Sequence, residues 1–412
     1  MESAITFEMA KQLLSSFAVI LFAGTISGFL SQKFNLPDVV VYLVAGIILG
    51  PEVAGLLRVP ATAALNQIIL IFGACYILFD GGASVKLRVL KKIWITLAAL
   101  STLGVLIMTA LTGLASHYVL GLPLITSMLL GSVIAPTDPA TIIPIFRQVI
   151  IKERVSQALI SESAFNDATG SVIAFAILSV AMGSAGFSLS TSLLNLLEQS
   201  VVGIIIGSAM GYLGLLLIAH EKYDFLAKYA PVVTMMAVVG TYLGAEDLQA
   251  SGFTAVFVFG IMLGNKRTFG FQMKQEDKER LDEYVARTAM IMRMFIFTLL
   301  GSQVDFGLIS KFVLPGIIII IFFMFAARPA TVLLCSLPDR RARWSFNEIL
   351  FMCWTRETGV IPAALAGLML GRKVPGGQTI AAITFIAILM TILIQATTAK
   401  WLAGKLGLLE KR

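Results

Sequence analysis

The stretch SESAFNDATGSVIAFAILSVA, residues 161–181, decides the fold class. From Gly170 onward it is apolar enough for a membrane helix, yet Glu162, Asn166 and Asp167 stand just before that point. An ionisable side chain within a membrane helix costs roughly 2.5–3.5 kcal/mol on insertion scales. Such groups are retained where they pair, line a wet cavity or carry a function. We therefore expect a functional site inside a membrane domain.

The composition of the whole chain indicates a membrane protein. Of 412 residues, 58% are hydrophobic and 13% are charged, and the mean hydropathy is +0.90. Soluble domains are nearer half apolar and one quarter charged. Because apolar runs of about 20 residues cross a bilayer, we predict an all-α polytopic membrane protein with about thirteen transmembrane helices. The apolar segments lie near residues 12–31, 38–57, 61–80, 93–116, 122–146, 156–183, 194–219, 229–246, 250–265, 284–302, 312–335, 345–371 and 378–403.

The basic residues predict an orientation. Most of the 31 Lys and Arg residues fall in loops that follow odd-numbered segments and in the C-terminal tail. Since basic loops stay in the cytoplasm, we expect the N-terminus outside and the C-terminus inside, in the plasma (inner) membrane of a prokaryote. The net charge of +7 then reflects orientation and anionic lipid headgroups, and it does not predict nucleic-acid binding.

No pattern in the chain predicts a cofactor or a structural metal centre. Cys75, Cys335 and Cys353 all lie in apolar segments, where we expect small core side chains and not disulfides or metal ligands. A His-Glu-x-x-His zinc motif is also absent from the sequence.

The segment SVIAPTDPATIIP, residues 132–144, predicts a broken helix. Pro136 and Pro139 bracket Thr137 and Asp138, and each proline removes a backbone donor and clashes with the preceding turn. Unwound backbone at membrane depth is tolerated only where it is enclosed by protein or lines a watery cavity. We therefore expect freed carbonyl groups near Asp138, such as that of Thr137, to be candidate cation ligands.

The opening stretch places two polar rows side by side on one helix. Glu162 and Asn166 are four residues apart, as are Ser163 and Asp167, so each pair follows one helical stripe. Ser163 and Asp167 offer the oxygen ligands that hard cations prefer. A carboxyl group removed from water binds its proton more tightly, so Asp167 is suited to hold either a proton or a cation.

A second break is predicted near the C-terminus. Arg328 lies in FAARPATV (325–332), and Arg356 lies in CWTRETGVIPAALAG (353–367), where Gly359 and Pro362 interrupt the apolar segment. The fourth to sixth segments and the eleventh to thirteenth segments share the order helix, broken helix, helix. They start on opposite sides of the membrane, as inverted repeats of secondary transporters do. We expect the two broken helices to cross and to form a binding site.

Several of these motifs resemble those of the NhaP-type monovalent cation/proton antiporters, relatives of the eukaryotic sodium/proton exchangers. LPDVVVYLVAGIILGP (36–51) and LFDGG (78–82) resemble parts of the family's second and third helices. TDP (137–139) and ESAFND (162–167) resemble its active-site motifs. The resemblance covers nearly the whole chain and implies the sodium/proton antiporter fold, a homodimer, and no enzymatic activity.

The resemblance implies an ion site and an activity. Asp167 would bind proton and cation alternately, and Asp138, Ser163 and the Thr137 carbonyl would complete the site. The implied function is exchange of a monovalent cation for a proton by an elevator-like alternation of access. Sodium is the expected cation, and lithium and potassium remain open.

The resemblance also implies roles for the surrounding charges. Asn166 stands where electrogenic relatives have Asp, which implies electroneutral one-for-one exchange. Glu162 would pair with a membrane arginine, with Arg328 the first candidate and Arg356 the second. Glu357 departs from the family pattern. It would pair with Arg356 or another neighbour, or carry a second proton, and the last role would end electroneutrality.

The implied division is a moving core on a dimerisation scaffold. We expect residues 1–92 and 229–311 to form the scaffold, residues 93–183 and 312–412 to form the core, and residues 184–228 to form a linker helix.

Three other interpretations stay open or are disfavoured. Asp80, at the end of the third segment, would attract cations into a cytoplasmic funnel or pair with Lys86. A cation channel remains an alternative. An intramembrane aspartyl protease is disfavoured, because its Gly-x-Gly-Asp motif is absent and the Tyr223-Asp224 pair falls in a predicted loop.

Overall fold

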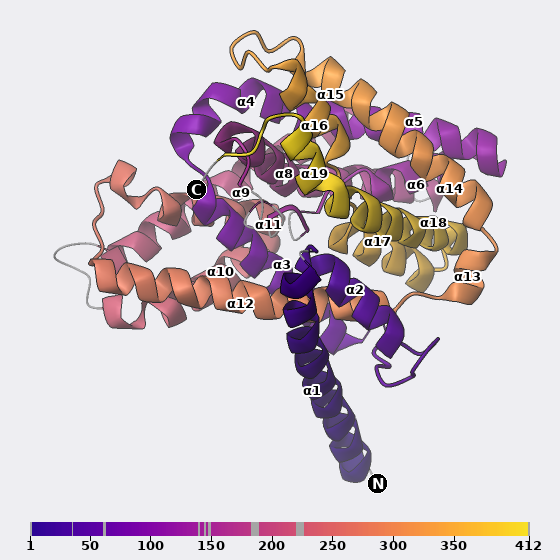
Figure 1. Cartoon of the computed structure of the whole chain (residues 1–412), viewed down its shortest axis with the longest axis horizontal. Helices are drawn as coiled ribbons and strands as arrows, with labels where there is room; N and C mark the ends of the chain where they lie inside the picture. The colour runs from indigo at the N-terminus through magenta and orange to yellow at the C-terminus, as the bar shows by residue number, and fades with distance from the viewer. Residues whose placement is uncertain are drawn as a thin grey trace.

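The apolar segments of the chain fold as helices (Figure 1). The computed structural model describes residues 2–34, 36–60, 63–138, 141–143, 146, 150–182, 189–219 and 226–410. Within these residues, eight helical spans are long and apolar enough to cross a membrane, and four shorter helices are also apolar. Together with a further helix, α10, they match the thirteen predicted segments, so the predicted all-α membrane fold is confirmed.

One group of helices packs mainly within itself. In this group α2 and α3 lie against α12, and α11 packs on both α3 and α9. Its members are α1 (Glu2–Phe34), α2 (Asp38–Leu49), α3 (Ala64–Ser84), α9 (Leu189–Ala219), α10 (Ala230–Asp247), α11 (Gly252–Gly264) and α12 (Gln275–Ser302). The short helices η1 (Ala227–Tyr229) and η2 (Lys266–Phe269) connect members of this group.

Two glycines explain how closely α3 and α11 approach. A Cβ atom at Gly260 would lie 2.3 Å from the backbone oxygen of Phe79, and one at Gly82 would lie 2.3 Å from the backbone oxygen of Phe257. Any larger side chain would force the two backbones apart. Small residues at such crossings are typical of membrane helices, where association depends on close packing.

A second group holds the broken helices. Its first half contains α4 (Leu87–Ser101), α5 (Leu103–Leu120), α6 (Leu124–Ile134) and α8 (Glu153–Ala181). Its second half contains α13 (Phe306–Ser310), α14 (Val313–Phe322), η3 (Phe323–Ala327), α15 (Arg328–Ser336), α16 (Phe346–Trp354), α17 (Val360–Gly371), α18 (Gly377–Met390), η4 (Thr391–Ala396) and α19 (Thr397–Lys405). The halves interlock, because α14 packs on α5, α15 on α4, and α17 and α18 on α6.

The start of α16 is fixed from α8. Ser345 and Glu348 form a capping box, in which each side chain bonds to the backbone of the other residue. Arg154, near the start of α8, forms an ion pair with Glu348 and donates to the backbone oxygen of Ala342 at 2.9 Å. This clamp fixes the position of α16 relative to α8, the helix that carries the polar rows.

Candidate functional site

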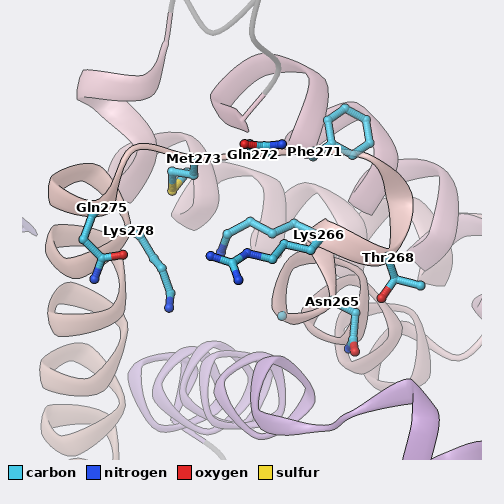
Figure 2. Close-up of a pocket in the computed structure, with 10 residues that line it drawn as sticks. Asn265, Lys266, Thr268, Phe271, Gln272, Met273, Gln275 and Lys278 are labelled. Carbon is cyan, nitrogen blue, oxygen red and sulfur yellow. The ribbon is translucent and has the colours of Figure 1, made fainter.

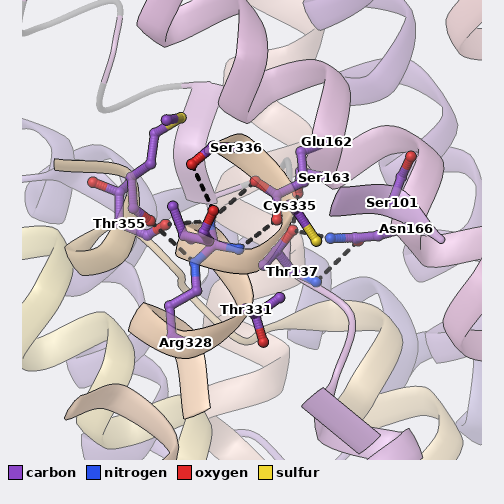
Figure 3. Close-up of polar contacts among 12 residues, drawn as sticks. Ser101, Thr137, Glu162, Ser163, Asn166, Arg328, Thr331, Cys335, Ser336 and Thr355 are labelled. Carbon is purple, nitrogen blue, oxygen red and sulfur yellow. Dashed lines mark hydrogen bonds and ion pairs between the residues drawn. The ribbon is translucent and has the colours of Figure 1, made fainter. Parts of the chain in front are cut away.

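The first break lies where the prolines predict it. α6 ends at Ile134, and the chain is not helical from residue 135 to residue 138. The amide of Thr137 donates to Asn166 Oδ1 at 3.1 Å, and Asn166 Nδ2 donates to Thr137 Oγ1 at 2.8 Å. The Thr137 hydroxyl in turn donates to Ser163 Oγ at 2.9 Å. Figure 3 shows these three side chains together. Pro139 lies outside the described residues.

The second break lies between α16 and α17. α16 ends at Trp354 and α17 begins at Val360, so the unwound backbone precedes Pro362 instead of following it. Proline in a first helical turn removes an amide that has no intrahelical partner. The amide of Thr358, inside the break, donates to the hydroxyl of Thr391 in η4 at 3.0 Å. The freed backbone is thus bound by a neighbouring helix.

Asp138 joins the two breaks directly. Its Oδ2 accepts hydrogen bonds from the backbone amide of Val360 at 3.2 Å and from the hydroxyl of Thr141 at 3.1 Å. Its own amide donates to the backbone oxygen of Glu357 at 2.9 Å. A carboxylate at the N-terminus of α17 is stabilised by the free amides and the dipole of that helix. The predicted crossing of the broken helices is therefore present.

Glycines allow this crossing. A Cβ atom built on Gly359 would lie 1.8 Å from Asp138 Oδ2, so no side chain fits there. On the other side of the first break, a Cβ atom at Gly170 of α8 would lie 2.1 Å from Cγ of Pro136. α8 therefore packs tightly against the unwound backbone, and its polar rows adjoin the break.

Asp167 lies one helical turn after Ser163 and is buried, with 1% of its surface exposed. Its Oδ1 atom has no hydrogen-bond partner within the described part of the chain. A buried carboxylate oxygen without a partner is costly unless a proton or a cation occupies it. The arrangement places one unsatisfied carboxyl group, on Asp167, beside a helix break whose own acid, Asp138, is held by backbone.

Glu162 is neutralised by an arginine. Of the two candidate partners, Arg328 makes the contact: its Nη1 lies 2.5 Å from Glu162 Oε1 and its Nη2 lies 3.0 Å from Oε2. Arg328 Nε also donates to the backbone oxygen of Met352, at the end of α16, at 3.0 Å. Both side chains are buried, and Figure 3 shows them at the centre of the polar contacts. Such a two-pronged pair cancels both charges and links α8, α15 and α16.

Arg356 and Glu357 do not pair with each other in the described structure. The Arg356 guanidinium lies 5.0 Å from the centre of the Phe323 ring, and its Nε and Nη2 have no hydrogen-bond partner among the described residues. Both carboxylate oxygens of Glu357 likewise have none in that part of the chain. Both residues are buried. The Arg356–Glu357 pair, one of the alternatives for Glu357, is therefore not formed.

Asp80 is buried in α3, with 4% of its surface exposed. Its neighbour Gly81 faces the side chains of Ile143 and Ile160, beyond the first break. Lys86, the partner considered above, forms an ion pair with Glu153. The funnel role of Asp80 stays a prediction.

Some groups that contact the first break or Asp138 were not among the site residues predicted from the sequence. Thr141, Gly170 and the amide of Val360 all contact the first break or its aspartate. Thr141 follows Asp138 by three residues, a spacing from which a local side-chain bond could have been inferred. The contact of Val360 depends on tertiary structure alone.

Comparison with known proteins agrees with this architecture. The sodium/hydrogen exchanger transmembrane family model matches residues 17–405. The Na(+)/H(+) antiporter 1 of Methanocaldococcus jannaschii is 29% identical, and the alignment covers 93% of each chain. The K(+)/H(+) antiporter NhaP of Alkalimonas amylolytica is 26% identical over 93% of this chain and 66% of its own.

A solved structure agrees as well. The sodium proton antiporter MjNhaP1 from M. jannaschii, solved at pH 8, superposes with a TM-score of 0.78 at 26% identity, covering 96% of this chain and 99% of that chain. The family model spans most of the sequence, and the chain belongs to the sodium/hydrogen exchanger family.

Proposed function

We propose that this protein exchanges a monovalent cation for a proton across the membrane. The observation that carries the proposal is the contact of Asp138 with both helix breaks, beside the unsatisfied carboxyl group of Asp167. Two broken helices that meet in this way form the substrate site of many secondary transporters. Membership of the sodium/hydrogen exchanger family supports the same activity.

In the proposed mechanism, proton and cation compete for Asp167. Ser163, Asp138 and the Thr137 carbonyl add oxygen ligands when the cation is bound. Glu162 takes no part in binding because Arg328 already neutralises it. An empty site would leave a bare carboxylate in a low-dielectric passage, which is costly. The core therefore crosses only when Asp167 holds a proton or a cation, and this requirement couples the two fluxes.

We infer a stoichiometry of one cation for one proton. The side-chain amide of Asn166 is hydrogen-bonded to Thr137: it accepts from the Thr137 backbone amide and donates to the Thr137 hydroxyl. It adds no ionisable group beside Asp167. Glu357 contacts Asp138 through its backbone oxygen, and neither of its carboxylate oxygens has a partner among the described residues, so we infer that it keeps its proton throughout the cycle and exchanges none.

Sodium is the proposed cation, and potassium is the alternative. Relatives described as Na(+)/H(+) antiporters and as K(+)/H(+) antiporters both align with this chain. The test uses purified protein in sealed liposomes that contain a pH dye, with the membrane potential clamped. We expect an imposed sodium gradient to drive a pH change that Asp167→Ala abolishes. A response to potassium alone would assign the alternative, and no response to sodium, potassium or lithium would refute antiport.

We propose that the helices divide into a moving core and a static scaffold. The core would comprise residues 93–183 and 312–412, and the scaffold residues 1–92 and 229–311. The packing of α4, α5, α6 and α8 against α14 to α18 supports this division. The helix α9, assigned above to a linker, packs on α10 and α11 and would stay with the static scaffold.

We also propose a homodimer with an external N-terminus and a cytoplasmic C-terminus, in a prokaryotic plasma membrane. α1 exposes Leu14, Phe22 and Phe29 on one side and packs on α2 and α12 through its C-terminal half (Figure 1). Mass measurement of the detergent-solubilised protein tests the dimer. Labelling of a single cysteine placed in each terminus of intact cells tests the orientation.

A further inference from the structure

A cavity of about 370 Å³ opens on the scaffold, away from the helix breaks. It lies between η2, the short helix that follows α11, and the first turn of α12 (Figure 2). The loops on this side of the membrane carry most of the basic residues of the chain. A cavity of this size accommodates a small ligand or a headgroup.

Three cations line this cavity. Lys266 and Arg267 come from η2, and Lys278 comes from the first turns of α12. Figure 2 shows Lys266 and Lys278 extending into the same space from the two sides. No acidic side chain is among the lining residues, and none of the three cations forms an ion pair in the part of the chain that the structure describes.

The pKa of Lys266 reflects its burial and the charged side chains around it. Its burial lowers the pKa of the ammonium group, and the charges of Lys278 and Arg267 lower it further, while Asp282 opposes them. The net result is a pKa below the ordinary value for lysine. An anion bound between these cations would remove the mutual repulsion that the free cavity leaves in place.

Hydrogen bonds hold the walls of this cavity in place without a ligand. Asn265 Oδ1 accepts from the amide of Leu87 at 3.1 Å, and its Nδ2 donates to the backbone oxygens of Val85 at 2.7 Å and Ile261 at 2.8 Å. The amide of Phe271 closes the η2 turn on the oxygen of Lys266 at 3.0 Å. A preformed site avoids the ordering cost of binding.

We propose that this cavity binds a phosphate-bearing anion, held by Lys266, Arg267 and Lys278 together with the hydroxyl group of Thr268. An ammonium or guanidinium group forms strong charge-assisted hydrogen bonds to phosphate oxygens. The phosphate belongs either to the headgroup of an anionic phospholipid or to a soluble phosphate. Bound there, it bridges η2 to α12 and stabilises the scaffold.

The experiment measures thermal unfolding of the purified full-length protein in detergent. One arm adds inorganic phosphate with the sodium concentration and ionic strength held constant. The other adds a short-chain phosphatidylglycerol, with short-chain phosphatidylcholine as the neutral comparison. The variants are Lys266→Gln and Lys278→Gln. The matched control is Arg280→Gln, which removes an exposed charge of α12 outside the cavity.

We expect the melting temperature of the unmodified protein and of Arg280→Gln to rise with added ligand. In Lys266→Gln and Lys278→Gln the apparent dissociation constant should rise about tenfold, the effect of losing one charged hydrogen bond. Without ligand, the melting temperature of Lys266→Gln should stay close to that of the unmodified protein, because the attraction of Asp282 and the repulsion of Lys278 and Arg267 act on Lys266 in opposite directions. This baseline separates lost binding from misfolding.

The two arms assign the source of the phosphate. A response to phosphatidylglycerol alone assigns the lipid headgroup, a response to inorganic phosphate alone assigns a soluble ligand, and a response to both assigns the phosphate group itself. No stabilisation in either arm, or an equal loss in Arg280→Gln, would overturn the proposal. Transport activity does not enter the measurement, so the result is independent of the proposed antiport.

Discussion

The carboxylate of Asp138, in the break after α6, accepts a hydrogen bond from the backbone amide of Val360, the first residue of α17, over 3.2 Å. The two residues are 222 positions apart in the sequence. The acid of one half of the core is therefore held by the helix terminus of the other half. A movement that separates the breaks would free Asp138, and a substitution that separates them should impair the site.

Gly359→Ala tests this contact. The added Cβ would lie 1.8 Å from Asp138 Oδ2, so either the Asp138 carboxylate or the break itself must shift, and the bond to the Val360 amide is disturbed. Overpacking of a well-packed core costs typically about 1–3 kcal/mol, and we expect cation-driven proton flux in liposomes to fall at least about tenfold. The control is Gly244→Ala in α10, where nothing lies within 4 Å of the added atom. Full flux in Gly359→Ala would contradict the contact.

Much of this architecture follows from the sequence for physical reasons. Apolar length fixes where helices cross a membrane, and Pro136 predicts a break because proline cannot continue the hydrogen-bond ladder. The second break includes Gly359, one of the two residues that predicted it, whereas Pro362 lies in the first turn of α17, where proline is tolerated. A proline indicates that a break is near but not on which side of it the backbone is unwound.

The partners of the buried charges follow only in part from the sequence. Arg328 was expected before Arg356 as the partner of Glu162, and Arg328 makes the contact. Both arginines lie in apolar segments, so only tertiary packing decides between them. In the same way, pairing with Arg356 was one of the alternatives for Glu357, and the structure does not form that pair. Adjacent residues do not face each other on a helix, and in the unwound segment only tertiary packing decides where the two side chains lie.

The protein should be more stable with the Glu162–Arg328 ion pair intact than with either partner removed. Glu162→Gln or Arg328→Gln leaves a buried charge without its partner, and breaking such a pair typically costs about 3–5 kcal/mol. We expect each single variant to lower the melting temperature strongly and the double variant Glu162→Leu/Arg328→Met to recover part of the loss.

An exposed ion pair supplies the control for this comparison. Arg287 and Glu283 lie one turn apart on α12 with most of their surfaces exposed. Because solvent screens such pairs, Arg287→Gln should change the melting temperature little. A double variant less stable than both single variants would show that the buried pair does not act through charge.

Asp339 should make stability depend on acid pH. It lies in the loop between α15 and α16, where burial opposes its ionisation. Hydrogen bonds from Thr96 and from the amides of Ala342 and Arg341 outweigh burial and hold its pKa below the usual value. The Thr96 hydroxyl donates a hydrogen bond to Asp339 Oδ2 over 2.6 Å.

The sign of the effect follows from linkage. Because the pKa of Asp339 is lower in the folded protein, its ionised form stabilises the fold. This stabilisation is complete above the pKa of the unfolded chain, about 4, and is lost as the pH falls through the pKa of the folded protein. Asp339→Asn should therefore melt lower than the unmodified protein at neutral pH, and the difference should shrink below about pH 4. Melting curves from pH 3 to pH 7 measure it. A difference that stays constant over that range would contradict the assignment.

Glu357→Gln tests the stoichiometry. The proposed mechanism assigns the exchanged proton to Asp167 alone, so this variant should keep cation-driven proton flux and its insensitivity to the clamped membrane potential. If Glu357 carried a second proton, flux in the unmodified protein would depend on voltage and Glu357→Gln would remove that dependence. Liposome flux at two or more clamped potentials distinguishes the two outcomes.

The most direct test of the central claim is the pH dependence of sodium binding to the purified protein, measured by calorimetry. If proton and cation share Asp167, the apparent dissociation constant for sodium should rise about tenfold for each unit by which the pH falls, once the carboxyl group is mostly protonated. Asp167→Asn should bind no sodium. Binding that is independent of pH, or that persists in Asp167→Asn, would contradict competition at this residue.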